Sequence, residues 1–207
     1  MKKIRILLGA LLFLGLPQAW SQTTSDSAQS RKFSVLSTYL TLLNWGEEKF
    51  NTHHYEFHFR YRITDKDQIG LKLTTWELFE PMGIQFWDPG LMEESEFYPG
   101  RLEEKGIGIT YQRFLWKKLY ASIEVLPLWK RYVDENKHEI RNGFKLYTTY
   151  HLGYHFDFLD NRVFLEPQIH CNYWPIDTKA PAGFETKDRK WTNYFLFEPN
   201  LYFGFAF

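Results

Sequence analysis

The sequence predicts an all-β protein, an eight-stranded antiparallel up-and-down transmembrane β-barrel. Aromatic residues make up 19% of the 207-residue chain, yet its mean hydropathy is only −0.44, so apolar and polar residues must be interleaved. Apolar side chains recur at every second position over several long runs. The connections between these runs alternate between short and long, as they do in transmembrane barrels.

The N-terminus has the features of an export signal. Basic residues in "MKKIR" precede the apolar run Ile6–Leu16, and small residues follow in Ala19–Ser21. The run is much shorter than the roughly 20 residues that cross a bilayer as a helix. We therefore expect a signal peptide at 1–21, a short periplasmic leader at 22–31 and a barrel domain at 32–207. An amphipathic first helix of the fold is the alternative.

The clearest strand is Tyr55–Ile63, where aromatic and apolar residues occupy one face and charged residues the other. A helix would mix the two kinds on every side, whereas a period of two separates them. Gly143–Phe158 repeats the pattern over far more than the usual five or six residues of a strand. Six further runs complete the set: Lys32–Trp45, Gln68–Leu78, Gly106–Leu115, Leu119–Tyr132, Val163–Trp174 and Tyr194–Phe207.

The connections predict which end of the barrel faces which side of the membrane. "TDKD", "WKK" and "LDNR" are tight turns, and they alternate with the longer "GEEKFNTH", Phe79–Lys105, Val133–Asn142 and Pro175–Asn193. Short periplasmic turns and longer extracellular loops are typical of outer-membrane barrels. Both termini are then expected on the periplasmic side.

Tryptophan placement gives a second argument for a membrane. Trp45, Trp76, Trp129 and Trp174 fall near the outer ends of strands, and Trp116 falls at a tight turn. Indoles favour the membrane interface, because the apolar ring can contact lipid there while the N–H forms a hydrogen bond in the polar region. The alternative is a soluble lipocalin-like barrel with its apolar face turned inward around a ligand.

The last strand carries Leu201, Phe203, Phe205 and the terminal Phe207 on one face. This segment resembles the C-terminal β-signal of Gram-negative outer-membrane proteins, and the architecture is similar to small eight-stranded barrels of the OmpA, OmpX and OmpW kind. The resemblance implies insertion by the barrel-assembly machinery and a place in the bacterial outer membrane, among lipid and lipopolysaccharide. We expect Phe195 and Phe197 on the lipid face too, and Glu198, Asn200 and Tyr202 inside, with this strand closing against the first.

The opposite faces of the strands then form a polar interior. Eight strands enclose just enough room for their own side chains, and buried charges must be paired. We therefore expect a packed, salt-bridged interior rather than an open pore. Its candidate network consists of Glu56, His58, Arg60, Arg62, Glu124, His151, Glu166, His170 and Glu198.

Two features of this interior leave alternatives open. Pro167 and Pro199 predict bulges or bends, which either aim Glu166 and Glu198 at a site or let them pair with Arg60 or Arg62. His151 and His170 are expected at similar height on neighbouring strands. With Glu166 they have the chemistry of a metal site, but a polar network explains them equally well, and no short ligand motif is present. We expect no metal and no cofactor.

The loop Phe79–Lys105 is the strongest functional indication in the sequence. Its proline, glycine, methionine and aromatic content is too apolar for a simple linker, and long ordered loops often carry binding. It would act as a lid, contact lipopolysaccharide or bind a partner protein. The residues proposed for this role are Met82, Phe86, Trp87, Met92, Phe97 and Tyr98.

The predicted function is that of a non-enzymatic structural or accessory component, or a subunit of an envelope complex that acts through its outer loops. With 25 basic and 25 acidic residues and no polybasic tract, the chain gives no case for nucleic acid. The alternative is an outer-leaflet lipid-modifying enzyme, a lipid A acyltransferase or deacylase. Its candidate groups have no recognisable nucleophile motif around them: Glu47, Glu48, His53, His54, Glu94 and Ser95.

Overall fold

The computed structural model describes residues 31–207, apart from 46, 48 and 50–52. The chain divides into two units, 1–30 and 31–207, and the description below concerns the second. The expected signal peptide, and the leader except for Arg31, lie outside the described residues. In the described part, no helix has the length and apolar character needed to cross a membrane.

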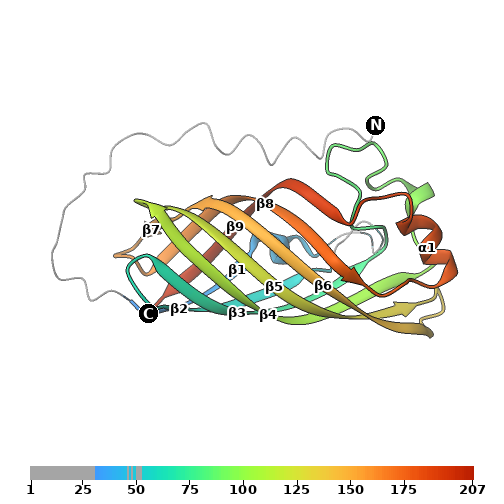
Figure 1. Ribbon diagram of the computed structural model, residues 1–207, viewed down its shortest axis with the longest axis horizontal. Coiled ribbons are helices and arrows are strands. Elements are labelled where there is room, and N and C mark those ends of the chain that lie inside the picture. The colour runs from blue at the N-terminus through green and yellow to red at the C-terminus, as the bar shows by residue number, and fades with distance from the viewer. Residues whose placement is uncertain (1–30, 46, 48, 50–52) are drawn as a thin grey trace. The chain divides into compact units, whose positions relative to one another are not determined.

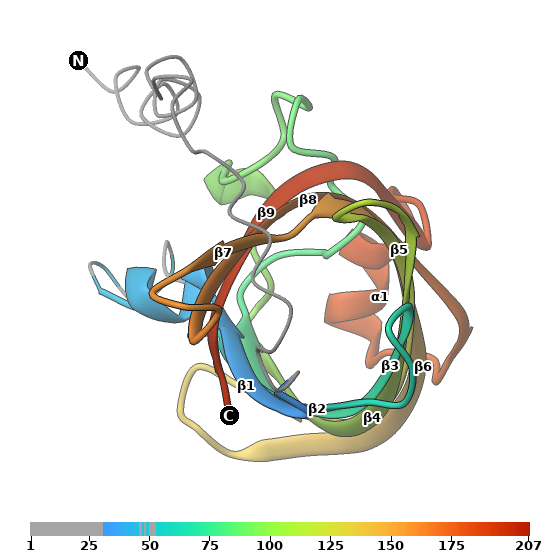
Figure 2. The same cartoon turned by 90° about the vertical axis from the view of Figure 1, so that its left-hand side faces the viewer.

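The second unit is all-β, an antiparallel sheet that closes in a ring (Figure 2). Strands β1 to β6 pair in chain order, β9 pairs with β1 and β8, and β8 also pairs with β7 and β6, which closes the circle. The strands are β1 Phe33–Thr38, β2 Tyr55–Arg62, β3 Asp67–Leu78, β4 Arg101–Trp116, β5 Leu119–Val133, β6 Glu139–Tyr154, β7 Phe156–Phe158, β8 Val163–Asp177 and β9 Tyr194–Ala206.

The structure has nine strands where the sequence predicted eight, because the predicted sixth strand is interrupted at His155. The His155 N–H donates to the Lys118 carbonyl oxygen, outside the regular ladder. The short β7 continues beyond this point and pairs with β8. Nine strands therefore occupy eight positions in the ring.

The two ends of the ring differ, and we call them the turn end and the loop end (Figure 1). The turn end holds the tight connections after β2, β4 and β7, together with the start of β1 and the end of β9, where the Phe33 N–H donates to the Phe207 carbonyl oxygen. The loop end holds the segments 79–100, 134–138 and 178–193. The last of these includes helix α1, Ala182–Asp188.

Three predicted boundaries at the loop end were wrong. β4 begins at Arg101, so the long loop is 79–100, and β8 continues to Asp177. Half of the predicted loop Val133–Asn142 is strand, and only 134–138 connects β5 to β6. Asp134 closes this turn, since its carboxylate and N–H both bond to the His138 backbone. Charged residues at these strand ends masked the alternation in the sequence.

The predicted first strand, Lys32–Trp45, was also wrong beyond Thr38. The chain turns there into a 3-10 helix, Tyr39–Leu43, and the Thr38 hydroxyl accepts from the Leu40 N–H. β1 therefore pairs with β9 only from Ser34 to Thr38. The expected closure of the last strand against the first holds over this half alone.

Side chains replace the missing strand between β2 and β9. Asn44 donates to the His54 carbonyl oxygen at 2.6 Å and accepts from the His54 N–H at 2.8 Å. Gln85 of the long loop does the same for β9, donating to the Tyr194 carbonyl oxygen and accepting from the Leu196 N–H, both at 2.9 Å. These bonds satisfy backbone groups that would otherwise lie at an open sheet edge.

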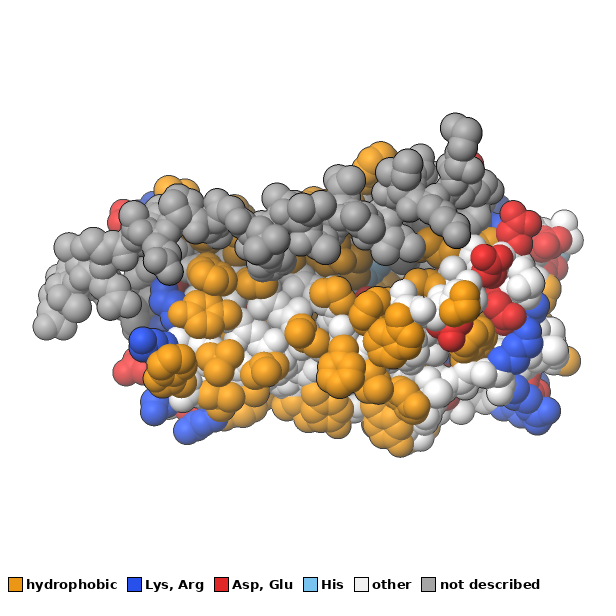
Figure 3. Space-filling view, turned by 90° about the horizontal axis from the view of Figure 1, so that it is seen from above, with side chains coloured by type: hydrophobic (Ala, Val, Ile, Leu, Met, Phe, Trp, Pro, Cys, Tyr) orange, Lys and Arg blue, Asp and Glu red, His pale blue; other side chains and the backbone are white. Residues whose placement is uncertain are grey.

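The outer face of the ring is apolar around its middle. Figure 3 shows hydrophobic side chains over the middle of one face and charged side chains gathered toward the two ends. This face exposes large apolar side chains on most strands: Phe57, Phe59, Leu71, Leu73, Ile107, Ile109, Tyr150, Leu152, Ile169 and Phe205. The predicted alternation in β2 is confirmed, because Glu56, His58 and Arg60 are buried inside.

Three aromatic residues expected on the outside lie inside instead. Trp76 and Trp174 are buried in a cluster with Tyr147. Trp76 points inward because it lies on the same face of β3 as the buried Lys72 and Thr74. Phe195 joins them because the register shifts opposite Cys171, between the His170 and Asn172 pairings. Trp45, Trp116 and Trp129 are exposed.

That register shift also bears on the two prolines. The register shift lies just before Pro199 and includes Phe197, whose φ is 56°, so an irregularity lies beside Pro199, although Pro199 itself pairs with Ile169. Pro167 pairs with Leu201 without a register shift, so the strand has no bulge at Pro167.

Candidate functional site

The largest group of charges inside the ring surrounds Lys72. Its ammonium nitrogen lies 2.8 Å from Glu56 Oε2 and 2.7 Å from Glu124 Oε2. His58 Nε2 lies 2.7 Å from Glu56 Oε1, and His151 Nε2 lies 3.5 Å from Glu124 Oε1. All five side chains are buried. The strands β2, β3, β5 and β6 thus bring together two carboxylates around one shared cation.

A second group joins β2 to β8 nearer the turn end. Arg60 Nη1 donates to Glu166 Oε2 at 2.7 Å, so the predicted pairing of these residues is confirmed. His155 bridges two carboxylates, with Nδ1 2.8 Å from Glu166 Oε1 and Nε2 2.8 Å from Asp157 Oδ1. Arg62 lies half-buried at the end of β2, apart from this pair.

His151 and His170 are paired directly across β6 and β8, as predicted, with ring centroids 5.3 Å apart and edge to face. His170 Nε2 lies 2.5 Å from Glu198 Oε2. Glu166 does not join them, because it is held by Arg60 and His155. Among the residues that the structure describes, no group of three or more His, Cys, Asp or Glu is placed to hold a metal ion.

These contacts give the middle of the ring a specific chemical character. Each buried carboxylate faces a cation or an imidazole, which is the arrangement that makes buried charge tolerable. Small residues leave room for this packing: a Cβ on Gly153 would come within 2.5 Å of the Tyr120 hydroxyl oxygen. The interior is therefore built to be filled by its own side chains.

The loop end is closed by apolar packing instead. Phe184 of α1 packs with Tyr98, Leu102, Tyr132 and Ala180, and the Tyr98 hydroxyl donates to Asp188 Oδ1 at 2.5 Å. In Figure 2, viewed from the turn end, α1 is visible within the outline of the ring at its far end. We call α1 and the loop 79–100 together the cap.

The six loop residues predicted to act together have different places in the cap. Met82 packs against the buried cluster of Trp76 and Trp174, and Tyr98 is buried. Phe97 is half-buried, whereas three side chains are exposed: Phe86, Trp87 and Met92. The loop therefore covers the mouth with one side and presents aromatic and thioether groups with the other.

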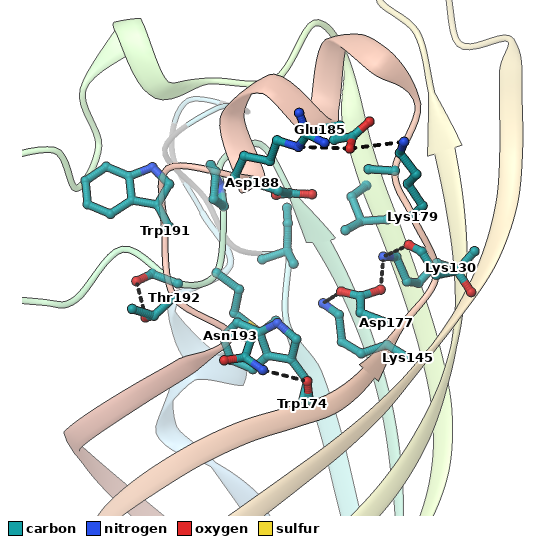
Figure 4. Close-up of a pocket in the computed structure, with 18 of the residues that line it drawn as sticks. Lys130, Lys145, Trp174, Asp177, Lys179, Glu185, Asp188, Trp191, Thr192 and Asn193 are labelled. Atoms are coloured by element: carbon teal, nitrogen blue, oxygen red, sulfur yellow. Dashed lines mark hydrogen bonds and ion pairs between the residues drawn. The ribbon is translucent and has the colours of Figure 1, made fainter.

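A cavity of about 330 Å³ lies between the cap and the ends of the strands (Figure 4). The sequence did not reveal it, because α1 lies within an expected loop and Trp174 was expected at the membrane interface. Pro181 directly before Ala182, with Glu185 in the first turn, was the available helix signal. The side chains that matter most for its chemistry are Lys130, Lys145, Trp174, Asp177, Trp191, Thr192 and Asn193.

Burial in the cap shifts the pKa values of two groups that lie outside the ring, Glu80 and Tyr98. Burial raises the pKa of the Glu80 carboxyl to about 7, although the Met92 N–H donates to it at 2.8 Å. Burial and the neighbouring Asp188 carboxylate raise the pKa of Tyr98 well above its ordinary value.

Of the residues considered for lipid chemistry, those that the structure describes have different surroundings. Glu94 and Ser95 are exposed, and the Ser95 carbonyl oxygen accepts from the Lys187 ammonium. His54 is buried and faces Glu56, with 3.2 Å between Nε2 and Oε2. Glu48 lies outside the described residues. In the described ranges, no hydrogen bond joins a serine or cysteine side chain to a histidine.

Comparison with known proteins gives no relative: no family model, no curated protein and no solved structure matches the chain.

Proposed function

We propose that the chain is an integral β-barrel of the bacterial outer membrane. One observation carries this proposal: charged side chains are buried inside the ring, and large apolar side chains are exposed around its outside. A protein surrounded by water would leave that apolar surface in contact with solvent, at about 25 cal/mol for each Å². A bilayer removes the penalty, and the closed ladder leaves few backbone groups unsatisfied in lipid.

We further propose that the barrel is a non-enzymatic structural or accessory component that binds through its outer loops. The interior is filled with paired charges, and the cap closes the loop end, which favours binding over transport. The exposed Phe86, Trp87 and Met92 lie on an ordered loop and provide a contact surface for a lipid or an envelope protein.

Fractionation and gel mobility test the membrane proposal. The full chain is expected in the outer-membrane fraction after carbonate washing, and to change mobility on a gel only when it is boiled. A protein that is mainly soluble, with the same mobility before and after boiling, would contradict the proposal.

Co-purification from a detergent extract tests the accessory role. A stoichiometric partner, lost when Trp87 and Phe86 are both changed to serine, supports a subunit of an envelope complex. The lipid A acyltransferase or deacylase alternative predicts an altered acyl pattern when the gene is deleted, which mass spectrometry detects. An altered pattern would replace the accessory role with the enzymatic one.

A further inference from the structure

The cavity beneath the cap is not used by the proposed function, and its lining indicates a ligand. Its volume of about 330 Å³ lies near the lower end of the ~300–1,000 Å³ range of small-molecule pockets. The walls come from the ends of β3, β5, β6 and β8 on one side and from the cap on the other. Figure 4 shows the side chains that converge on it.

Each charged side chain of the lining already has a partner, and the partner of Asp188 is the Tyr98 hydroxyl, which donates to its Oδ1 at 2.5 Å. The Lys130 ammonium contacts the Asp177 carboxylate, and Lys145 Nζ lies 2.6 Å from Glu104 Oε1 just behind the wall. On the cap side, Glu185 Oε1 lies 3.0 Å from Arg189 Nε and 3.4 Å from Lys179 Nζ. An ionic ligand would have to compete with these pairs, so the lining favours a neutral ligand.

Directional hydrogen-bonding groups remain along the same walls. The Asp177 side chain is 30% exposed, which leaves carboxylate oxygen surface open to accept further bonds. Thr192 and Asn193 border the cavity between Trp191 and Trp174 (Figure 4). Asn193 donates to the Trp174 carbonyl oxygen, and its own side-chain oxygen accepts no recorded bond from a described residue.

Two indoles supply the apolar part of the lining. Trp174 comes from β8 and Trp191 follows α1, so they border the cavity from the strand side and from the cap side. Glu96 holds Trp191 in place by accepting from its indole N–H at 3.1 Å. Aromatic faces carry partial negative charge and attract the weakly positive hydrogens of C–H groups.

We propose that this cavity binds a small neutral saccharide. A sugar ring has C–H faces that fit against Trp191, and hydroxyl groups that bond to Asp177 and Asn193. The same chemistry is offered by a free sugar and by the sugar headgroup of a glycolipid. The inference goes beyond the proposed function and stands on the cavity lining, whatever medium surrounds the ring.

Isothermal titration of the full chain in a detergent without a sugar headgroup, such as lauryldimethylamine oxide, tests the proposal. The soluble probes are glucose, maltose and lactose, with glycerol phosphate as the ionic comparison. The lipid probes are lipopolysaccharide and phosphatidylethanolamine. Saturable binding of a neutral sugar identifies a free ligand, and binding of lipopolysaccharide alone identifies a glycolipid. Tighter binding of glycerol phosphate, or binding of neither a neutral sugar nor lipopolysaccharide at millimolar concentration, would overturn the proposal.

Matched variants locate the binding. Trp191→Ala should weaken it roughly tenfold, equivalent to about 1.4 kcal/mol, whereas Trp116→Ala should leave it unchanged, because Trp116 is exposed at the turn end and does not line the cavity. Asp177→Asn keeps the shape of the wall and should also weaken binding. It therefore controls for a loss of binding that comes only from local collapse in Trp191→Ala. Unchanged affinity in both cavity variants would overturn the assignment. A protein that fractionates as soluble but binds sugar would contradict the membrane proposal alone.

Discussion

The middle of the ring and its loop end differ in the side chains that they expose, although both bury charge: Lys72 in the middle, and Lys145 with Glu104 at the loop end. In the middle, Lys72 lies inside between two carboxylates, while Leu71 and Ile109 face outward. At the loop end, Trp76 and Trp174 are buried inside, while charged residues such as Glu94 and Arg189 are exposed. The exposed surface is therefore apolar in the middle of the ring and charged at the loop end. This difference is expected if the middle meets an apolar medium and the loop end meets water.

The largest expected effect comes from breaking a charge pair in the middle. Glu166→Gln removes the partner of buried Arg60 and should reduce the free energy of unfolding by about 3–5 kcal/mol. Urea titration of the protein in detergent, followed by tryptophan fluorescence, measures it.

A second substitution separates the effect of the unpaired charge from the effect of altered side-chain packing. Adding Arg60→Met to Glu166→Gln should recover part of the loss, because no charge is then left unpaired. As a control, Arg113→Ala removes a pair whose arginine is half exposed and should cost at most about 1 kcal/mol. A larger loss in the control than in Glu166→Gln would contradict the contrast between buried and exposed charge.

Apolar packing at the loop end gives the next effect. Phe184→Ala empties the contact between α1 and Tyr132 and should destabilise the cap by about 3–5 kcal/mol. We expect faster proteolysis within 79–100 and 178–193, while the gel mobility shift of the ring persists. Loss of that shift would show that the cap and the ring unfold together.

Matched substitutions on the outer face of the ring and on the long loop compare a surface that we expect to meet lipid with one that we expect to meet water. Ile109→Arg places a charge at the exposed middle of β4 and should cost about 2–4 kcal/mol in a bilayer. The same substitution at Trp87 in the loop should be nearly neutral for folding. Refolding into lipid vesicles measures both, and an equal response at the two sites would refute the difference in surroundings.

The smallest effect is a dependence of cap stability on pH. Because burial raises the folded-state pKa of Glu80 to about 7, the folded loop favours the protonated carboxyl. Stability is then fully present below the ordinary pKa of about 4.3 and decreases as the pH rises toward 7. The protection factors of the amides in 79–100, which correct for the intrinsic rise of exchange rates with pH, should therefore fall between about pH 4 and about pH 7, and Glu80→Gln should remove this fall. An equal change in the variant would exclude Glu80 as its source.

Prediction from the sequence succeeded where one period extended over a whole strand. Tyr55–Arg62 alternates without interruption, so its two faces and its buried charges were correctly assigned. It failed where local chemistry overrode the period. Thr38 capped a turn that ended β1, and the register shift opposite Cys171 turned Phe195 inward.

The candidate site was predictable in its residues and not in its contacts. Alternation assigned Glu56, Arg60 and Glu166 to the interior, but the Lys72-centred group depends on how four strands are staggered. The cavity was invisible in the sequence, because its walls come from segments far apart in the chain and from a helix within an expected loop.

The sequence by itself determined the all-β class, the approximate strands and, for most of them, which face is polar, because side chains alternate across a strand with a fixed period of two. The tertiary structure decided which buried charges meet, where the ring loses strand pairing beyond Thr38, and that Trp174 lines a cavity. Those outcomes depend on register and closure between strands, and Arg60 reaches Glu166 only because β2 and β8 face each other across the ring.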